Sequence, residues 1–475
     1  MTVYTILSIY LLLTLLSGFI GYRKSAATPE DYFLANRGLG SIVVFFTFIA
    51  TNFSAFFFLG FAGEGYRTGY SYYALMGFGT AFAALSFYLI GFKAWQEGKR
   101  NRYITPAEMM GDKTGSSSLK LLYLLVMVFF TLPYMAVQPI GAGIILETLT
   151  GGQIPYFWGA TGLTTFVVVY VFIGGMRTVA ITDMIQGVLM FGLMFGAVWV
   201  VADSLGGITA ANEQVYAIQP DLFSRAGGGG YFTWQKWMSL MLLWVFCVPM
   251  FPQMFMRFYV SKDLKAFKFA TVMYAFVPLI LFICPVMIGV WGHLSFPDLV
   301  GKEADNILPM MLNLHAPQWL AAMIMTGALA AFMSTLDSQL LALSTMLTRD
   351  LFVSFVRPKA NFALQIWVGR VLIIVLAIIG LAIAFQPPAT IFVIVKNAFT
   401  GLSILFPATF VVLHFKNPNP TACFLSIAVG EAFLLAYLLG WIPAGVLMGF
   451  EPVLPLVALA GVIAAGGSLP KKYGK

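Results

Sequence analysis

The stretch GGMRTVAITDMIQG, residues 174–187, is the most informative part of this chain because it places an acid, Asp183, in a long apolar run. Carboxylates rarely enter membrane helices without an ion, a proton or a basic partner. Two interpretations of Asp183 follow: it is an ion-coupling residue of a transporter, or it is a structural acid at the membrane edge that pairs with Arg177. The rest of the sequence has to decide between them.

The composition is that of a membrane protein. Of the 475 residues, 60% are hydrophobic and only 10% are charged, and the mean hydropathy is +0.88, whereas soluble domains are usually about 45–50% apolar. The net charge of +8 does not indicate nucleic-acid binding, because the basic residues gather in short loops rather than on one face. Cys247, Cys284 and Cys423 lie singly in apolar stretches and predict neither a disulfide framework nor a zinc site.

The chain is predicted to cross the membrane thirteen times, since a spanning helix needs ~20 largely apolar residues. The first apolar stretch has no basic segment before it and no small-residue cleavage site, so we expect a retained helix rather than a signal peptide. The longest loops are too short to hold a separate core, and we expect one transmembrane domain over residues 1–475. The predicted spans are residues 3–22, 41–60, 73–91, 121–146, 156–173, 181–201, 237–255, 269–291, 320–347, 366–385, 391–413, 422–442 and 453–465.

The basic residues predict the orientation of these spans. With the N-terminus outside, 21 of the 27 Lys and Arg residues fall in cytoplasmic loops or the C-terminal tail, and Arg257 is one of them. This bias follows the positive-inside rule and predicts a multi-pass protein of the plasma (inner) membrane with a cytoplasmic C-terminus. The six exceptions are Arg67, Arg225 and Lys302 on the outer side and Lys236, Arg370 and Lys396 near or within helices.

Two of the predicted spans have signs of broken backbone. In the second span, Thr51, Asn52 and Ser54 interrupt an aromatic run, and in the seventh span Pro249 and Pro252 each remove a helical hydrogen bond. The two spans are five segments apart. Interrupted helices at matching positions of two halves point to a transporter binding site at an inverted repeat, whereas ordinary proline kinks are the alternative for either helix alone.

The ninth span carries the densest polar face. In GALAAFMSTLDSQLLALS, residues 327–344, the residues Ala331, Ser334, Thr335 and Ser338 form one stripe of a helix. Sodium prefers oxygen ligands, so these hydroxyls together with free carbonyls of a broken second span predict a sodium site. The alternative is that the hydroxyls bond their own helix or join neighbouring helices.

Asp337 lies beside this stripe and needs a compensating charge. A cation, a proton or a basic residue such as Arg349 or Lys396 are the alternatives, and spacing alone does not choose among them.

Four segments of the chain resemble the sodium:solute symporter family, which includes bacterial proline, pantothenate and monocarboxylate permeases and is also known as solute carrier family 5. The resemblance implies an all-α fold of the leucine-transporter type with two inverted five-helix repeats. These repeats would cover residues 40–205 and 233–415, with a peripheral helix at 1–24 and two peripheral helices at 420–468. The segments are EDYFLANRGLG (30–40), GGMRTVAITDMIQG (174–187), FPQMFMRFYVSKD (251–263) and MSTLDSQLLALSTMLTRDLF (333–352).

The resemblance also implies two ion sites. A second cation site would map to Asp183, Ser334 and Ser338, but Asp337 stands where the sialic acid permease has a serine, and this leaves sodium or a proton open as the second ion. The main sodium site would be formed by the carbonyls of Ala50, Phe53 and Ala331 with the hydroxyls of Ser334 and Thr335.

By position, the resemblance places the solute between the second, third, fourth, seventh and eleventh spans. A neutral pocket lined by Gln and Asn fits a small organic acid better than a sugar. The nominated residues are Asn52, Ser54, Phe57, Tyr73, Gln138, Phe246 and Asn397.

Together these observations predict a symporter in which Na⁺ drives the import of a monocarboxylate or pantothenate-like acid by alternating access. The alternatives are a sodium- or proton-coupled carrier of an amino acid such as proline, or of a sugar. An enzyme is not expected, because His293, His315 and His414 lie far apart and no catalytic motif occurs. The expected partners are the solute, sodium and the lipid bilayer, with no nucleic acid and no obligate protein partner.

Overall fold

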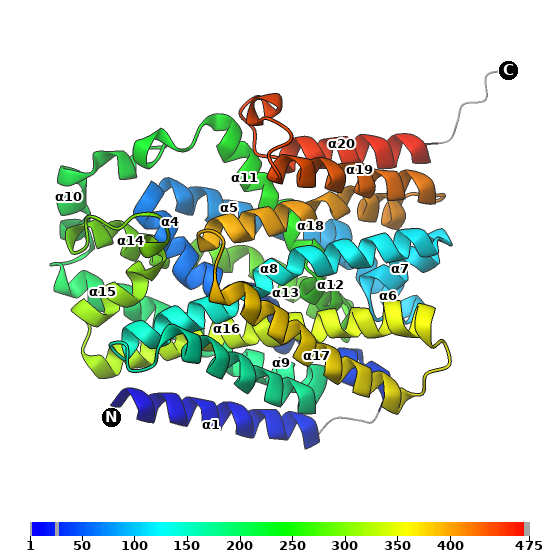
Figure 1. Ribbon diagram of the computed structural model, residues 1–475, viewed down its shortest axis with the longest axis horizontal. Coiled ribbons are helices and arrows are strands. Elements are labelled where there is room, and N and C mark those ends of the chain that lie inside the picture. Colours follow the sequence, from blue (N-terminus) through cyan, green and yellow to red (C-terminus); the bar gives the residue numbers. More distant parts are fainter. Residues whose placement is uncertain (1, 24–27, 470–475) are drawn as a thin grey trace.

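The protein is a bundle of helices. The computed structural model describes residues 2–23 and 28–469, and within these ranges it contains no β-strand. Most of the long helices run roughly side by side (Figure 1). Lys24, Lys471, Lys472 and Lys475, which contribute to the predicted charge bias, lie outside the described residues.

The helices follow one another without any inserted sheet, and short π and 3-10 segments continue several of them. Among these are η2 (Phe56–Gly60), η3 (Phe87–Gly91), η6 (Val248–Met250), η8 (Gly301–Asn306) and η9 (Leu347–Val356). The α-helices are α1 (Thr2–Arg23), α2 (Pro29–Leu34), α3 (Ser41–Asn52), α4 (Phe61–Thr68), α5 (Ser71–Ser86), α6 (Phe92–Asn101), α7 (Pro106–Thr114), α8 (Ser117–Leu149), α9 (Tyr156–Ser204), α10 (Ile208–Ile218), α11 (Trp234–Cys247), α12 (Pro252–Tyr259), α13 (Leu264–Leu281), α14 (Ile283–Trp291), α15 (Ile307–His315), α16 (Gln318–Met346), α17 (Phe362–Phe385), α18 (Ile391–His414), α19 (Pro420–Leu438) and α20 (Val453–Ser468).

The number of membrane spans agrees with the predicted thirteen. In the described ranges, nine continuous helices are long and apolar enough to cross a membrane, and two bent pairs each count as one more span. Two shorter apolar helices, Tyr156–Phe172 and Val453–Ser468, bring the sum of nine, two and two to thirteen. The all-α membrane fold is therefore confirmed.

Both predicted interruptions are present. The helix Ser41–Asn52 and the following segment Phe56–Thr68 are bent by 59°, and Trp234–Met250 is bent by 54° from Pro252–Tyr259. Phe251 is extended at the second bend, because Pro252 after it disfavours the helical conformation. The sequence pattern therefore located both breaks to within a few residues.

The predicted loop between the fifth and sixth spans is reduced to a sharp kink, since α9 consists of two helices, Tyr156–Phe172 and Gly175–Ser204, that meet there. The backbone changes conformation at Gly175, where φ is 61° and ψ is −163°, a region that only glycine adopts readily. A Cβ there would lie 2.7 Å from the carbonyl oxygen of Tyr32. Beside it, Arg177 pairs with Asp31 of α2 at 2.5 Å, so the proposed pairing of Arg177 with Asp183 is wrong.

Helix α16 lies at the centre of the bundle. In the most apolar 18-residue stretch of α16 and of α18, 83% of the residues are buried inside the protein. The corresponding share is 28% in α1, 33% in α17 and 39% in α19. The remaining surface of α1, α17 and α19 is apolar and faces outward, which suits contact with lipid. Polar side chains on α16 are therefore shielded by other helices rather than by lipid.

The two ends of the bundle are each closed by ion pairs. One end holds α4, α10 and α15, and we call it the α10 end; the opposite end holds α6 and α7, and we call it the α7 end (Figure 1). At the α10 end, Arg67 contacts Glu64 at 3.1 Å and Asp305 at 2.6 Å. Asp305 also accepts the backbone N–H of Ile391 at 2.9 Å. These contacts join α4, η8 and the start of α18.

Asp305 lies in η8, outside the spans, and burial raises its pKa to about 6 although Arg67 opposes the shift. The carboxylate is therefore charged at neutral pH and able to hold Arg67. At the α7 end, Lys120 and Asp350 are 3.3 Å apart and Arg349 and Glu108 are 3.4 Å apart.

Candidate functional site

The break after α3 exposes main-chain groups in the middle of the bundle. The helix ends at Asn52, and Phe53 has φ −91° and ψ 104°, which is extended. The N–H of Ala55 donates to Oε1 of Gln138 at 3.0 Å, and the N–H of Phe56 donates to Oγ of Ser54 at 3.2 Å. Gln138 and Ser54 thus supply partners that the interrupted helix lacks, as buried backbone groups require.

The hydroxyl stripe of α16 meets the carbonyl side of this break. Oγ of Ser334 donates to the carbonyl oxygen of Ala50 at 2.7 Å. Oγ1 of Thr335 lies 3.2 Å from the carbonyl oxygen of Phe53 and 3.4 Å from that of Ala50. All four residues are fully buried, and Ala331 lies one turn earlier on the same buried helix.

This donor set fits a small monovalent cation. It consists of hydroxyl and carbonyl oxygens, which are the ligands that hard cations prefer. The carbonyls of Ala50 and Phe53 lie at the end of α3, where the break removes their regular helical partners. A cation here would replace the hydroxyl-to-carbonyl hydrogen bonds without leaving any oxygen unpaired.

A second polar cluster lies on the same helix, and it contains a guanidinium. Nη2 of Arg257 contacts Oδ2 of Asp183 at 3.1 Å and Oγ of Ser338 at 2.5 Å. Nε of Arg257 donates to Oγ1 of Thr47 at 2.8 Å, and the Thr47 hydroxyl in turn donates to Asp183. The prediction that Arg257 lies in a loop is wrong, because its side chain is completely buried.

Asp337 has partners that the sequence did not suggest. Its Oδ2 accepts the hydroxyl of Tyr170 at 2.7 Å, and its Oδ1 lies 3.0 Å from Oγ of Ser338. The two basic candidates are engaged elsewhere, Arg349 with Glu108 and Lys396 with Glu451 at 2.9 Å. Neither pairs with Asp337, and that interpretation is wrong.

A small central cavity lies next to the break, between the two bent helices. Its volume is about 20 Å³, which is room for about one water molecule. It is lined by Asn52, Phe56, Phe57, Phe61, Met76, Thr80, Tyr134, Trp244, Phe282 and Phe399. In this structure the central cavity is therefore too small to hold an organic molecule unless the surrounding helices move.

The cavity contains two of the seven nominated solute residues, Asn52 and Phe57. The other five lie elsewhere: besides Ser54 and Gln138 at the break, Tyr73 donates its hydroxyl to the carbonyl oxygen of Leu279 at 2.7 Å. Phe246 lines a separate apolar hollow together with Phe406 and Leu89. Asn397 is half-buried on α18 and does not line the cavity.

Two cavity residues carry hydrogen-bonding atoms that no protein group uses. Within the described ranges, Nε1 of Trp244 and Oγ1 of Thr80 are buried and have no hydrogen-bond partner. A buried donor without a partner costs free energy unless a ligand or water satisfies it. Sequence reasoning missed both residues, because a tryptophan and a threonine inside apolar helices carry no motif.

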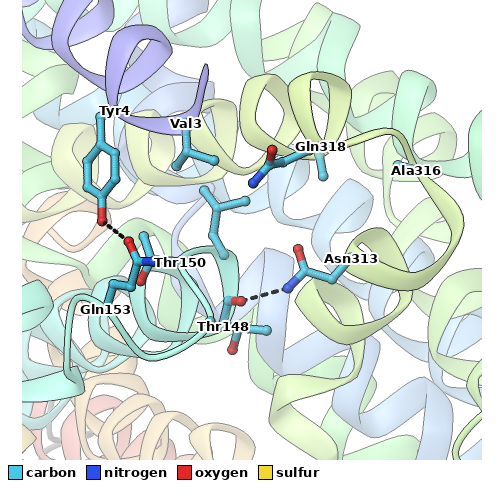
Figure 2. A pocket seen from close by; sticks show the side chains of 11 residues that line it. Val3, Tyr4, Thr148, Thr150, Gln153, Asn313, Ala316 and Gln318 are labelled. Carbon is cyan, nitrogen blue, oxygen red and sulfur yellow. Dashed lines mark hydrogen bonds between the residues drawn. The ribbon is translucent and has the colours of Figure 1, made fainter. Parts of the chain in front are cut away.

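A wider hollow lies at the surface of the α10 end. It has a volume of about 500 Å³ and lies between the start of α1, the end of α8 and the start of α16. Figure 2 shows Gln153, Asn313 and Gln318 around it, with Tyr4 bonded to Gln153 and Asn313 bonded to the carbonyl of Thr148. It shares no lining residue with the central cavity or with the hydroxyl stripe of α16.

Comparisons with known proteins agree with this geometry. The family profile described as "Sodium:solute symporter family" matches residues 32–430. The osmoregulated proline transporter OpuE of Bacillus subtilis is 28% identical over 475 residues, covering 97% of this chain and 93% of the relative. The sodium/pantothenate symporter of Escherichia coli is 28% identical over 445 residues, covering 92% and 90%.

Two solved structures share the fold. A Na⁺-coupled sialic acid symporter superposes with a TM-score of 0.81 at 19% identity, covering 98% of each chain. Mhp1, a nucleobase-cation-symport-1 family transporter, superposes with a TM-score of 0.63 at 14% identity, covering 93% of this chain and 94% of the other. The predicted leucine-transporter fold is confirmed.

The role of Gln138 at the break leads to a stability prediction. Gln138→Met leaves the N–H of Ala55 buried without an acceptor, which costs about 1–3 kcal/mol. We expect a lower melting temperature for the purified variant in detergent. Gln339→Met is the control, because the Gln339 carboxamide is also fully buried but forms no hydrogen bond within the described residues. Equal melting temperatures for the two variants would contradict the capping role.

Proposed function

The chain belongs to the sodium:solute symporter family, and from this premise we propose that it imports a small carboxylate-bearing solute together with sodium by alternating access. As a member of this family it is a multi-pass membrane transporter rather than an enzyme, and Na⁺ is its coupling ion. What the proposal adds is the ion site, the orientation, the solute site and the class of solute.

The proposed sodium site consists of the carbonyl oxygens of Ala50, Phe53 and Ala331 and the hydroxyls of Ser334 and Thr335. The observation that carries it is the contact of both hydroxyls with carbonyls of the broken helix, at 2.7 to 3.4 Å. A bound cation would hold α3 against α16. Because the ligands come from two helices, their separation releases the ion, and this links ion occupancy to movement of the helices.

We assign the α10 end to the outside of the cell. The positive-inside rule supports this assignment. Basic residues are concentrated in and around α6 and α7, whereas α4 with Arg67, the segment after α10 with Arg225, and η8 with Lys302 carry few. On this assignment, Arg67 and Asp305 close the outer side, and solute entry requires that their contact opens.

The solute would bind in the central cavity after it widens. The free donors of Trp244 and Thr80 suit a carboxylate, and Asn52, whose Nδ2 donates to the hydroxyl of Tyr274 at 2.5 Å, has a second N–H to offer. The aromatic walls suit a compact apolar body. In the described part of the chain no charged side chain lines the cavity, so a zwitterion would lack an acidic partner for its amine. This favours a pantothenate-like or monocarboxylic acid, while the similarity to a proline transporter supports proline as the second candidate.

The ion site is tested by removing its hydroxyls. Hydrogen bonds to charged groups are worth ~1.5–3 kcal/mol, and a tenfold change in affinity corresponds to about 1.4 kcal/mol. We therefore expect the double variant Ser334→Ala with Thr335→Ala to bind sodium at least tenfold more weakly. The measurement is the rise of the melting temperature with NaCl, against choline chloride at the same pH and ionic strength.

The matched control for the ion site is Ser344→Ala with Thr345→Ala. These hydroxyls are buried on the same helical segment but bond the carbonyl of Leu341 in their own helix. The control should keep the wild-type sodium response. If the first double variant also keeps it, the ion-site assignment is wrong.

The solute site is tested with Trp244→Phe and Thr80→Val, which remove one polar atom each at nearly constant shape. We expect each to raise the KM for the transported acid about tenfold, because a bond to a carboxylate is lost, while the sodium dependence stays unchanged. Sodium-driven uptake of labelled pantothenate and labelled proline into proteoliposomes measures this. Phe246→Leu is the control, and an unchanged KM in both cavity variants would remove these residues from the solute site.

A further inference from the structure

The buried cluster around Arg257 occupies the place where resemblance suggests a second cation site. We define the Arg257 cluster as Arg257, Asp183, Thr47, Ser338 and Asp337, whose side chains are all at most 1% exposed. They come from α12, α9, α3 and α16. A site for a free cation needs oxygens that are not committed to protein groups.

Two of the oxygens that a second sodium would need, one on Asp183 and one on Ser338, are already bonded to the guanidinium. Oδ2 of Asp183 accepts from Nη2 of Arg257 at 3.1 Å, and Oγ of Ser338 accepts from the same nitrogen at 2.5 Å. Nε of Arg257 donates to Thr47 at 2.8 Å, and Nη1 donates to the carbonyl of Gln253 at 3.2 Å. All three guanidinium nitrogens are thus directed at specific acceptors.

The remaining oxygens of the cluster also have protein partners, with one exception. The hydroxyl hydrogen of Ser338 has two acceptors in reach, the carbonyl oxygen of Ser334 at 2.7 Å and Oδ1 of Asp337 at 3.0 Å. Oδ2 of Asp337 accepts from Tyr170. Only Oδ1 of Asp183 forms no hydrogen bond within the described residues, and one oxygen does not make a cation cage.

Charge repulsion also disfavours a second sodium ion in the Arg257 cluster. A sodium ion bound by Asp183 and Ser338 would touch oxygens that also touch the guanidinium, so two positive charges would lie close together in a buried environment. Like charges repel strongly where water is excluded. Since arginine stays protonated in proteins, the cluster cannot remove this repulsion by losing a proton from Arg257.

We infer that Arg257 is a built-in cation which replaces a second sodium, so that the protein binds one sodium ion, at the α3–α16 site. The inference rests on the proposed function, because it assumes that the main sodium site is as assigned. It also gives Arg257 a positioning role: from α12, beyond the second helix break, it holds α3, α9 and α16 together through one side chain.

The test is a count of bound sodium ions on the purified full-length protein, with ²²Na⁺ as the only probe and no solute. We expect one saturable ion per protein and a Hill coefficient of one. A count of two, of which one is lost in Asp183→Asn, overturns the inference and leaves the proposed function intact. A count of zero contradicts the proposed function itself, so the two failures are distinguishable.

Variants test whether the guanidinium is what excludes the second ion. Arg257→Met removes the charge at similar length, and we expect a second, weaker ²²Na⁺ site to appear; the double variant Arg257→Met with Asp183→Asn should return to one. Arg349→Met, which removes an arginine outside the cluster, should stay at one. A monodisperse Arg257→Met protein that still binds a single ion overturns the inference, and if this variant does not fold, the wild-type count alone decides.

Discussion

A broken main chain in the interior of a membrane protein needs hydrogen-bond partners from elsewhere, and this constraint shapes the centre of the molecule. The break after α3 leaves an N–H side and a carbonyl side. Gln138 of α8 satisfies the N–H of Ala55, and the hydroxyls of Ser334 and Thr335 contact the carbonyls of Ala50 and Phe53. Side chains of α8 and α16 thus supply the hydrogen-bond partners that the interrupted helix lacks. On the proposed function, the carbonyl side is the ion site, because a cation can replace hydroxyl partners.

Buried carboxylates in the interior also have partners, in this case arginine side chains. Asp183 is paired with Arg257, and Asp305 at the α10 end is paired with Arg67 and also accepts the N–H of Ile391 at the start of α18. Each arginine comes from a helix next to a break, so each pair joins a bent segment to a neighbouring helix. The bent helices therefore carry both the proposed ion ligands and the ion pairs Arg67–Asp305 and Arg257–Asp183, so movement of a bent segment would act on both.

The sequence predicted features that depend on local pattern. The two breaks could be read from Pro249, Pro252 and polar residues in an aromatic run, and the i, i+3, i+4 spacing placed Ser334 and Thr335 on one face. Contacts between residues far apart in the sequence could not be predicted in this way. Arg177 is six residues from Asp183 in the sequence, yet the partner of Asp183 is Arg257, which is 74 residues away. The fold brings these two residues together, and the spacing in the sequence does not indicate it.

The residues now proposed for the solute differ from most of those nominated from the sequence for the same reason. Gln138 and Ser54 look like ligand residues in a sequence, but the break uses them as caps, and only coordinates show which buried polar groups remain free. Trp244 and Thr80 meet this criterion and also line the central cavity. Arg257 could have been noticed earlier, since a basic residue within an apolar segment such as FPQMFMRFY indicates a buried partner.

The central claim is that a monovalent cation binds where α16 meets the end of α3. The most direct measurement is an anomalous difference map from crystals in which thallium replaces sodium. The account predicts a peak surrounded by the carbonyl oxygens of Ala50 and Phe53 and the hydroxyls of Ser334 and Thr335, with both hydroxyls turned away from the carbonyls. A peak elsewhere, with the hydroxyl-to-carbonyl bonds unchanged, would contradict it.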